Sequence, residues 1–413
     1  MSDAPGESES QPDAKNEAET MALFHGYINR NLNLKQIDAE RREQLARIGT
    51  LRKSAVITYA ARLTAMPVRA PIGIMYDDLL PFTDMLANCS GDRISVILET
   101  PGGAGEVGRE MVEILHERFR HVSFIVPGTA KSTGTIMVLG GDEFLMGSTS
   151  SLGPIDAQLF NDGKQYSADA LIEGLKRIKD EVEQTGKLNS AFIPILQKIS
   201  PGELEHAYNA LQFARETVRE WLALYKFSDW KKHSSDGRPV TEDDKRQRAD
   251  EIAAALCSQS RWRTHGRSIR IPDLEALRLR VTNYDREREL KDAITRYHIL
   301  LRMTFDAGNV YKVFETPTAT LAMRFNMEVT QVEQNMPQPR SVVANVQCGK
   351  CRKSLKVQID LQPGVPHRPG AVRYPKSGKL PCPSCNQTIN LEPVRKEIEQ
   401  NLGKKALDTQ PTD

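Results

Sequence analysis

Short apolar runs alternate with longer amphipathic segments in the first half of the chain. Residues 55–59 and 93–98 are brief and rich in β-branched side chains, which is typical of buried strands. Residues 34–51 and 106–119 show the spacing of amphipathic helices, and residues 122–126 predict a further strand. A strand, a helix and a strand in this order predict a parallel sheet with right-handed crossovers.

The same pattern divides the 413 residues into six stretches. They are a disordered acidic tail over 1–20, an α/β core over 21–225, a polar linker or insertion over 226–250, a helical, arginine-rich extension of the core over 251–335, a cysteine-containing module over 341–396 and a frayed tail over 403–413.

Composition narrows the class of protein. Hydrophobic residues make up 39% of the chain and charged residues 27%, as in soluble globular proteins. The formal net charge of +2 does not mark the whole chain as a partner of nucleic acid or of a membrane surface. No stretch approaches the roughly 18 consecutive apolar residues of a membrane span, and the first residues lack the apolar segment of a signal peptide. We therefore expect a cytoplasmic protein with no membrane span.

A glycine-rich turn follows the strand over 93–98. Pro101, Gly102 and Gly103 lie between this strand and the next helix. Glycines let backbone N–H groups turn toward a ligand, and a helix N-terminus adds a partial positive charge. Such a site can hold an oxyanion. A plain tight turn is the alternative interpretation.

Ser132 lies at the next junction between a predicted strand and a predicted helix. It follows a strand that ends at Pro127-Gly128, and it precedes the apolar residues 133–139, which we expect to be helical. A serine at a strand-to-helix junction presents its hydroxyl beside the free N–H of Thr133, an arrangement that suits a nucleophile next to an oxyanion hole. An ordinary N-cap is the alternative.

The order of these motifs resembles the serine dehydrogenase proteinase family, which is similar to signal peptide peptidase A and, more distantly, to the Clp peptidase and the crotonases. The resemblance covers about residues 50–225. The matching segments are Thr100-Pro101-Gly102-Gly103, Ser132-Thr133-Gly134-Thr135, Gly141-Asp142-Glu143 and Leu152-Gly153-Pro154-Ile155-Asp156-Ala157-Gln158, with a later match at Trp262-Arg263-Thr264-His265-Gly266. Two positions differ from the family pattern, because Thr133 and Ala157 replace a glycine and a proline.

This resemblance implies an α/β fold, the Clp/crotonase-type β-β-α superhelix. The pattern along the chain adds a helical extension, and the cysteine pairs described below add a small C-terminal zinc ribbon. It implies a serine peptidase with Ser132 as nucleophile and an oxyanion hole of amides near Gly102, Gly103 and Thr133. Relatives form rings or stacks, so a homo-oligomer acting on a peptide or protein substrate is expected.

The general base is less clearly marked. No histidine lies between Ser132 and His206, so a histidine base like that of the Clp peptidase is not expected. Similar enzymes use a lysine, which must be desolvated to become neutral. Lys187 opens an apolar run and is our preferred base. The alternatives are Lys164, Lys176, Lys179 and His265. Asp156 is a candidate supporting residue, or it simply caps a Gly-Pro turn.

Two Cys-x-x-Cys pairs, Cys348/Cys351 and Cys382/Cys385, lie near the C-terminus. Four thiolates at this spacing suit a structural Zn²⁺ in a zinc ribbon, with iron in a rubredoxin-like site as the main rival. No open coordination position is implied, so we expect no catalysis by the metal. Lysines and arginines flank the cysteines, which indicates a protein or nucleic-acid partner of the ribbon, or merely a solvated surface.

Three functions follow from these observations. The first is an ATP-independent cytosolic serine peptidase that forms an acyl-enzyme on Ser132 with a lysine base. The second is a weak or inactive pseudopeptidase scaffold that recruits a partner through its zinc ribbon. The third is a crotonase-like acyl-CoA enzyme, and the pairing of Pro101-Gly102-Gly103 with Ser132 argues against it.

Overall fold

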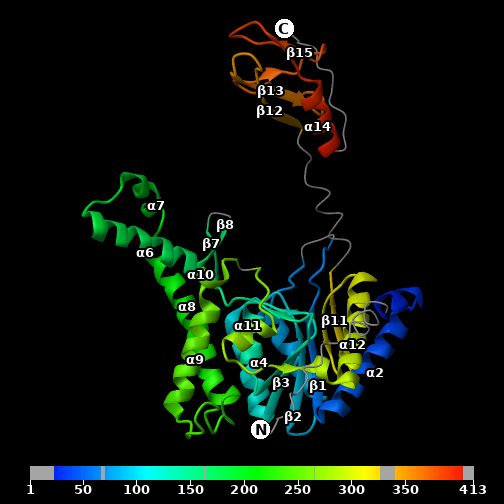
Figure 1. Ribbon diagram of the computed structural model, residues 1–413. Helices are drawn as coiled ribbons and strands as arrows, with labels where there is room; N and C mark the ends of the chain where they lie inside the picture. The colour runs from blue at the N-terminus through cyan, green and yellow to red at the C-terminus, as the bar shows by residue number, and fades with distance from the viewer. Residues whose placement is uncertain (1–22, 67–69, 162–163, 265, 326–339, 403–413) are drawn as a thin grey trace, which may run out of the picture. The chain divides into compact units, whose positions relative to one another are not determined.

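The computed structural model describes residues 23–66, 70–161, 164–264, 266–325 and 340–402 (Figure 1). It divides into two units, Met1–Phe325 and Asn326–Asp413, each of which is described by itself. The tails predicted over 1–20 and 403–413 lie outside the described residues.

A seven-stranded sheet organises the first unit, in the order β11-β10-β1-β2-β3-β5-β9. The central strands are parallel and nearly every residue in them is buried, as expected of strands covered on both faces. The strands are β1 (Ala55–Ala61), β2 (Arg93–Glu99), β3 (His121–Val126), β5 (Glu143–Met146), β9 (Thr282–Asn283), β10 (Val310–Glu315) and β11 (Thr320–Arg324). The predicted α/β fold class and its first three strands are confirmed.

Helices cover both faces of the sheet. Alternate residues of β2 point to opposite sides, so Val96 packs with Met111 and Met137 while Ile97 packs with Tyr297. The first face carries α3 (Leu79–Leu86), preceded by the 3₁₀ turn η1 (Tyr76–Asp78), α4 (Gly105–Arg118) and α5 (Thr133–Leu139). The second carries α2 (Leu34–Arg52) and α12 (Arg288–Asp306), which pack against each other.

Short strands add a second layer at the carboxyl ends of the sheet strands. β4 (Thr129–Ala130) pairs in parallel with β6 (Ser151–Leu152), and Thr100 forms a parallel bridge to Ala130. β3 is therefore followed by the short strand β4 before α5, and β5 is followed by the short strand β6. This repeat places Thr100 and Ser132 beside each other at one edge of the sheet.

Residues 251–335 differ from the predicted helical extension, because β10 and β11 complete the main sheet. The antiparallel β10 is fixed by buried ion pairs. Glu315 accepts two hydrogen bonds of 2.8 Å from Arg41 of α2, and Lys312 donates to both oxygens of Asp78 at 2.7 and 2.8 Å. Buried charges are tolerated only when paired in this way. The described part of this region, which ends at Phe325, thus belongs to the core of the first unit.

The polar linker or insertion predicted over 226–250 is helical at residues 226 and 242–250. α8 (Pro201–Trp221) continues through the π-helical turn η3 (Leu222–Lys226), and α9 (Glu242–Cys257) then packs beside it (Figure 1). Thr241 caps α9 in a capping box with Asp244, and Arg215 of α8 pairs with Asp250 at 2.9 Å. The polar composition reflects an amphipathic helix with one exposed face.

The remaining elements of the first unit are short, apart from α6. They are the hairpin β7 (Gln158–Asn161) and β8 (Lys164–Ser167), α6 (Ala168–Thr185), the 3₁₀ turn η2 (Ser190–Phe192), α7 (Ile193–Leu196), α10 (Gln259–Trp262), α11 (Ile271–Ala276) and the 3₁₀ turn η4 (Tyr284–Arg286).

The second unit is a small ribbon. One sheet contains β12 (Ser341–Gln347), β13 (Ser354–Asp360) and β14 (Val372–Arg373), a hairpin contains β15 (Lys379–Pro381) and β16 (Thr388–Asn390), and α14 (Glu392–Leu402) follows. Its core contains Val346, Ile359, Tyr374 and Leu391 together with Cys348 and Cys382. So few apolar residues stabilise a domain poorly, which favours a structural metal.

Candidate active site and metal site

Ser132 lies at a strained turn between β4 and α5. Its φ of 50° and ψ of −118° are rare for a residue with a side chain. Its side chain makes no capping hydrogen bond, and no hydrogen bond of the described residues involves its hydroxyl. The N-cap interpretation of the hydroxyl is therefore wrong. The N–H of Thr133 opens α5 and has no partner within the helix.

Gly102 and Gly103 lie directly against this turn. Gly102 has a φ of 103°, and a Cβ atom there would fall 2.7 Å from the Ser132 Cβ and 2.9 Å from the Lys131 carbonyl oxygen. Gly103 has a φ of 149°, and a Cβ atom there would fall 2.3 Å from both N and O of Ile74. The loop thus fits between Ile74 and Ser132 only because both residues are glycines.

Backbone hydrogen bonds fix the loop on both sides. The N–H of Ile74 donates to the Gly102 carbonyl at 2.7 Å, and the hydroxyl of Thr133 donates to the Gly103 carbonyl at 2.7 Å. Gly102 donates its own N–H to the Thr100 hydroxyl at 3.2 Å. No hydrogen bond of the described residues uses the N–H of Gly103, so Gly103 and Thr133 leave their donors open beside Ser132.

Ser132 opens into a cavity of about 640 Å³. One wall is the face of α8 that carries His206, Asn209, Ala210 and Phe213, whose spacing places them on one side of the helix. The ionisable side chains that line the cavity are Glu106, Asp156 and His206. The sequence interpretation set His206 aside because of its distance along the chain, and the structure brings it to the cavity of Ser132.

Asp156 is buried in the cavity wall. It accepts hydrogen bonds from the Gln158 amide at 2.6 Å and from the Ser167 hydroxyl at 2.5 Å. Ser167 in turn caps α6. Both carboxylate oxygens are engaged, so Asp156 orders the segment that leads from the cavity into α6.

The structure does not bring Lys187 together with Ser132. Lys187 is exposed in the turn after α6, and it does not line the cavity. Lys176 and Lys179 are exposed on α6, where Lys179 pairs with Glu183 at 3.6 Å. His265 and the side chain of Lys164 lie outside the described residues.

Lys131 is a residue that sequence reasoning missed. Burial lowers the pKa of its amine to about 8. The amine donates to the Leu152 carbonyl at 2.9 Å, to the Arg267 carbonyl at 3.1 Å and to the Ser268 hydroxyl at 3.2 Å. These contacts hold two neighbouring segments to the residue before Ser132. Its place next to the predicted nucleophile is the only sequence signal that marks it.

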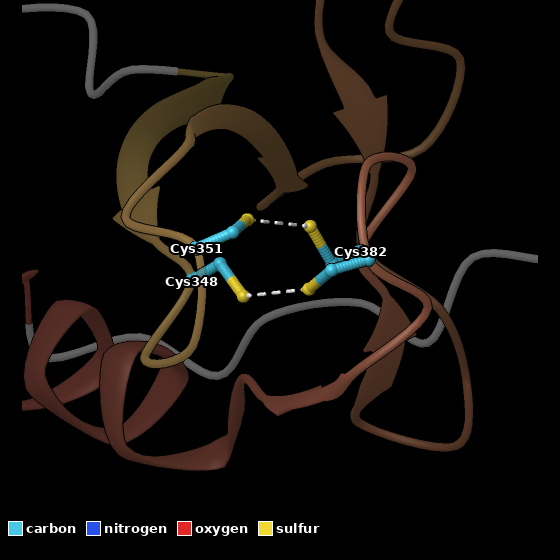
Figure 2. A group of neighbouring side chains, drawn as sticks. Cys348, Cys351 and Cys382 are labelled. Atoms are coloured by element: carbon cyan, nitrogen blue, oxygen red, sulfur yellow. Dashed lines mark hydrogen bonds between the residues drawn. The ribbon is translucent and has the colours of Figure 1, made fainter.

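The four cysteines of the two pairs form one cluster in the ribbon. The sulfurs of Cys348 and Cys385 lie 3.6 Å apart, as do those of Cys351 and Cys382, and all four lie within 4.8 Å of one another (Figure 2). A tetrahedral zinc with bonds of about 2.3 Å to sulfur places its ligands roughly 3.8 Å apart. The cluster therefore fits a tetrahedral metal ion.

Backbone donors favour the thiolate form of two of these ligands. The N–H groups of Cys351 and Lys350 lower the pKa of Cys348 to about 6, and that of Ser384 lowers the pKa of Cys382. Thiolates are the metal-binding form of cysteine.

Comparison with known proteins supports this description of the first unit. Residues 20–193 match the family described as ClpP-like SDH-type serine proteinase. Two uncharacterized proteins of Methanocaldococcus jannaschii are similar. MJ0137 is 27% identical over 163 residues, 38% of this chain and 55% of the relative, and MJ1495 is 30% identical over 89 residues, 22% of this chain and 29% of the relative. The chain thus spans about half the length of the first relative and less than a third of the second.

Among solved structures, the chain resembles a mutant of the 1510-N membrane-bound stomatin-specific protease. The identity is 22%, the TM-score is 0.21, and the match covers 34% of this chain and 64% of that one. Within the described residues of this chain, no helix has the length and apolar character needed to cross a bilayer.

The cysteine cluster yields a metal prediction. Protein purified without chelator should contain one zinc per chain by plasma mass spectrometry, and Cys382→Ser should lower this at least about tenfold because a structural site uses all four thiolates. Cys257→Ser, which changes a cysteine of the first unit, is the matched control and should keep its zinc. Iron in place of zinc, or full zinc in Cys382→Ser, would contradict the prediction.

Proposed function

We propose that this protein hydrolyses peptide bonds through an acyl-enzyme on Ser132, because residues 20–193 match the ClpP-like SDH-type serine proteinase family. The observation that carries the proposal is the strained Ser132 turn against the Gly102-Gly103 loop. A serine hydroxyl without a hydrogen-bond partner, beside open N–H donors and a cavity, has the geometry that acyl transfer requires.

The reaction follows from these groups. The Ser132 oxygen attacks the peptide carbonyl carbon while a base takes its proton. The carbonyl oxygen becomes negative, and the N–H groups of Gly103 and Thr133 stabilise it, each such donor contributing a factor of about 10²–10³ in rate. The base returns the proton to the leaving amine, and water then hydrolyses the ester. These chemical steps consume no nucleotide, and we propose that the activity is ATP-independent.

We propose His206 as the general base. Of the three ionisable side chains on the cavity, Asp156 already accepts two hydrogen bonds, and Glu106 lies in the first turn of α4, where its charge interacts favourably with the helix dipole. Imidazole is the side chain that most often serves as a general base in catalysis. Transfer from Ser132 to His206 requires a bridging water or closure of α8 on the peptide.

Lys187 is the alternative candidate for the general base. To act as the base it must move from its exposed turn to the cavity, either within one chain or from a second copy in a homo-oligomer. In both cases the cavity must desolvate its amine. His206 needs no such rearrangement of the chain, which is why we favour it.

The cavity also indicates the substrate. Ile136, Ile155, Leu159 and Phe213 give it apolar walls near Ser132. We propose that it accepts an apolar side chain next to the cleaved bond of a peptide or protein substrate. The four free thiols of the cysteine cluster favour a reducing compartment, so we propose the cytosol as the site of action.

A catalytically weak scaffold is the second candidate. It is favoured by one observation, the exposed position of Lys187 away from the cavity. On this proposal the ribbon recruits a partner and the Ser132 cavity binds peptide without cleaving it.

A fluorophosphonate probe tests the nucleophile. The zinc-loaded wild type should label with one adduct per chain, and Ser132→Ala should lose labelling because the attacking oxygen is gone. Ser148→Ala, which removes an exposed serine, is the control and should label like wild type. Fluorescence of Trp221, Trp230 and Trp262, all in the first unit, checks folding. A folded wild type that does not label, or a Ser132→Ala variant that does, would overturn the proposal in favour of the scaffold.

The labelling rate also separates the two bases. His206→Asn should slow labelling by about 10²-fold or more, the usual effect of losing a general base, while Lys187→Met should stay within about twofold of wild type. Lys198→Met, an exposed lysine of the same region, is the control for charge. A slow Lys187→Met with a normal His206→Asn would reverse the assignment and leave Ser132 in place.

A further inference from the structure

The ribbon carries a one-sided charge that the proposed peptidase does not use. Residues 340–391 contain nine lysines and arginines and one acid, Asp360. Asp360 is buried, accepts a 2.8 Å hydrogen bond from Gln358 and lies 3.9 Å from Arg373. The surface of this segment is therefore almost purely cationic.

The other cations of this segment are exposed on several loops and strands. They are Arg340, Lys350, Arg352, Lys353, Lys356, Arg368, Lys376 and Lys379, and no ion pair of the described residues holds any of them. The remaining described acids of the ribbon lie on α14, where Glu399 pairs with Arg395 at 3.0 Å and Glu392 accepts from Tyr374 at 3.0 Å. Glu392 also lies against Gly378, so α14 offsets part of the charge near Lys376 and Lys379 and leaves the other cations of the segment without an acidic neighbour in an ion pair of the described residues.

A structural explanation accounts for only part of this charge. A Zn²⁺ ion with four thiolates carries a net charge of −2, and neighbouring lysines offset it. Nine cations against one acid leave a surplus of eight, so the cluster would neutralise a quarter of it. Unpaired like charges repel one another in the folded ribbon, which favours a polyanionic ligand.

The surface chemistry indicates which polyanion. Val372 is the only large apolar side chain of the described ribbon that is well exposed. Protein partners usually bind through a buried apolar or aromatic centre, which this surface lacks. Phosphate backbones instead need cations spread along a surface. We propose that the zinc ribbon binds nucleic acid through its phosphates, without sequence preference.

The test uses the full zinc-loaded chain and a fluorescein-labelled 20-nucleotide single strand, followed by anisotropy. The association constant should fall with salt, with a slope of log K against log [salt] of roughly −2 or steeper, which corresponds to about three or more phosphate contacts. The triple variant Lys356→Glu, Arg368→Glu, Lys376→Glu should weaken binding at least about tenfold at low salt. Each of these positions is at least five residues from a metal-ligating cysteine, so zinc content should stay at one per chain.

A matched variant separates local from global charge. Lys35→Glu, Lys232→Glu, Arg246→Glu changes three exposed cations of the first unit by the same total charge and should bind within about twofold of wild type. The double variant Lys356→Arg, Lys376→Arg, in which Arg368 is unchanged and every charge is kept, should bind like wild type. Equal loss in both charge-reversal variants, salt-independent binding, or tighter binding of a poly-glutamate of equal charge would overturn the proposal. So would the absence of binding to a folded, zinc-loaded wild type.

Discussion

The close approach of two backbones, at Gly102 and Ser132, is the constraint on which the candidate site depends. A single added carbon at Gly102 would fall 2.7 Å from the Ser132 Cβ, closer than side chains approach one another. The loop after β2 and the turn after β4 can meet only because that carbon is missing. Their contact brings Gly103 and Thr133, which hydrogen-bond to each other, to the turn that carries Ser132.

The rest of the first unit holds these two segments in place. Parallel strands bring the carboxyl ends of β2 and β3 to the same edge, and the bridge from Thr100 to Ala130 sets their register. Ile74 covers the outer side of the glycine loop. α5 is buried along its whole length, and this packing offsets the strain of Ser132 at its start. The site is therefore a product of the sheet and not of a free loop.

The sequence predicts what is local and not what is distant. Residues 133–139 were expected to be helical because an apolar run after a junction serine is a local signal, whereas the meeting of the glycine loop with Ser132 was expected only from the family resemblance. His206 lines the cavity only because α8 packs against it, and no sequence motif predicts this packing. Residues 242–250 looked like a linker because an amphipathic helix with a wide polar face has a linker's composition. β10 was missed because Lys312 and Glu315 are charges that only distant partners, Asp78 and Arg41, make compatible with a buried strand.

Whole-chain charge was similarly uninformative about the ribbon. The net charge of +2 conceals a segment with nine cations and one acid, because acids elsewhere balance it. Net charge is therefore informative only when it is calculated for each domain, and this requires the domain boundary that the fold defines.

The most direct test of this account is the rate at which Gly102→Ala reacts with the fluorophosphonate probe. Gly202→Ala, where a Cβ meets nothing within 4 Å, is the matched control. We predict that Gly102→Ala keeps its tryptophan fluorescence and zinc but labels about a hundredfold more slowly or worse, because the added methyl displaces the loop from Ser132. Labelling of a folded Gly102→Ala at the rate of Gly202→Ala would contradict the claim that this contact makes Ser132 a nucleophile.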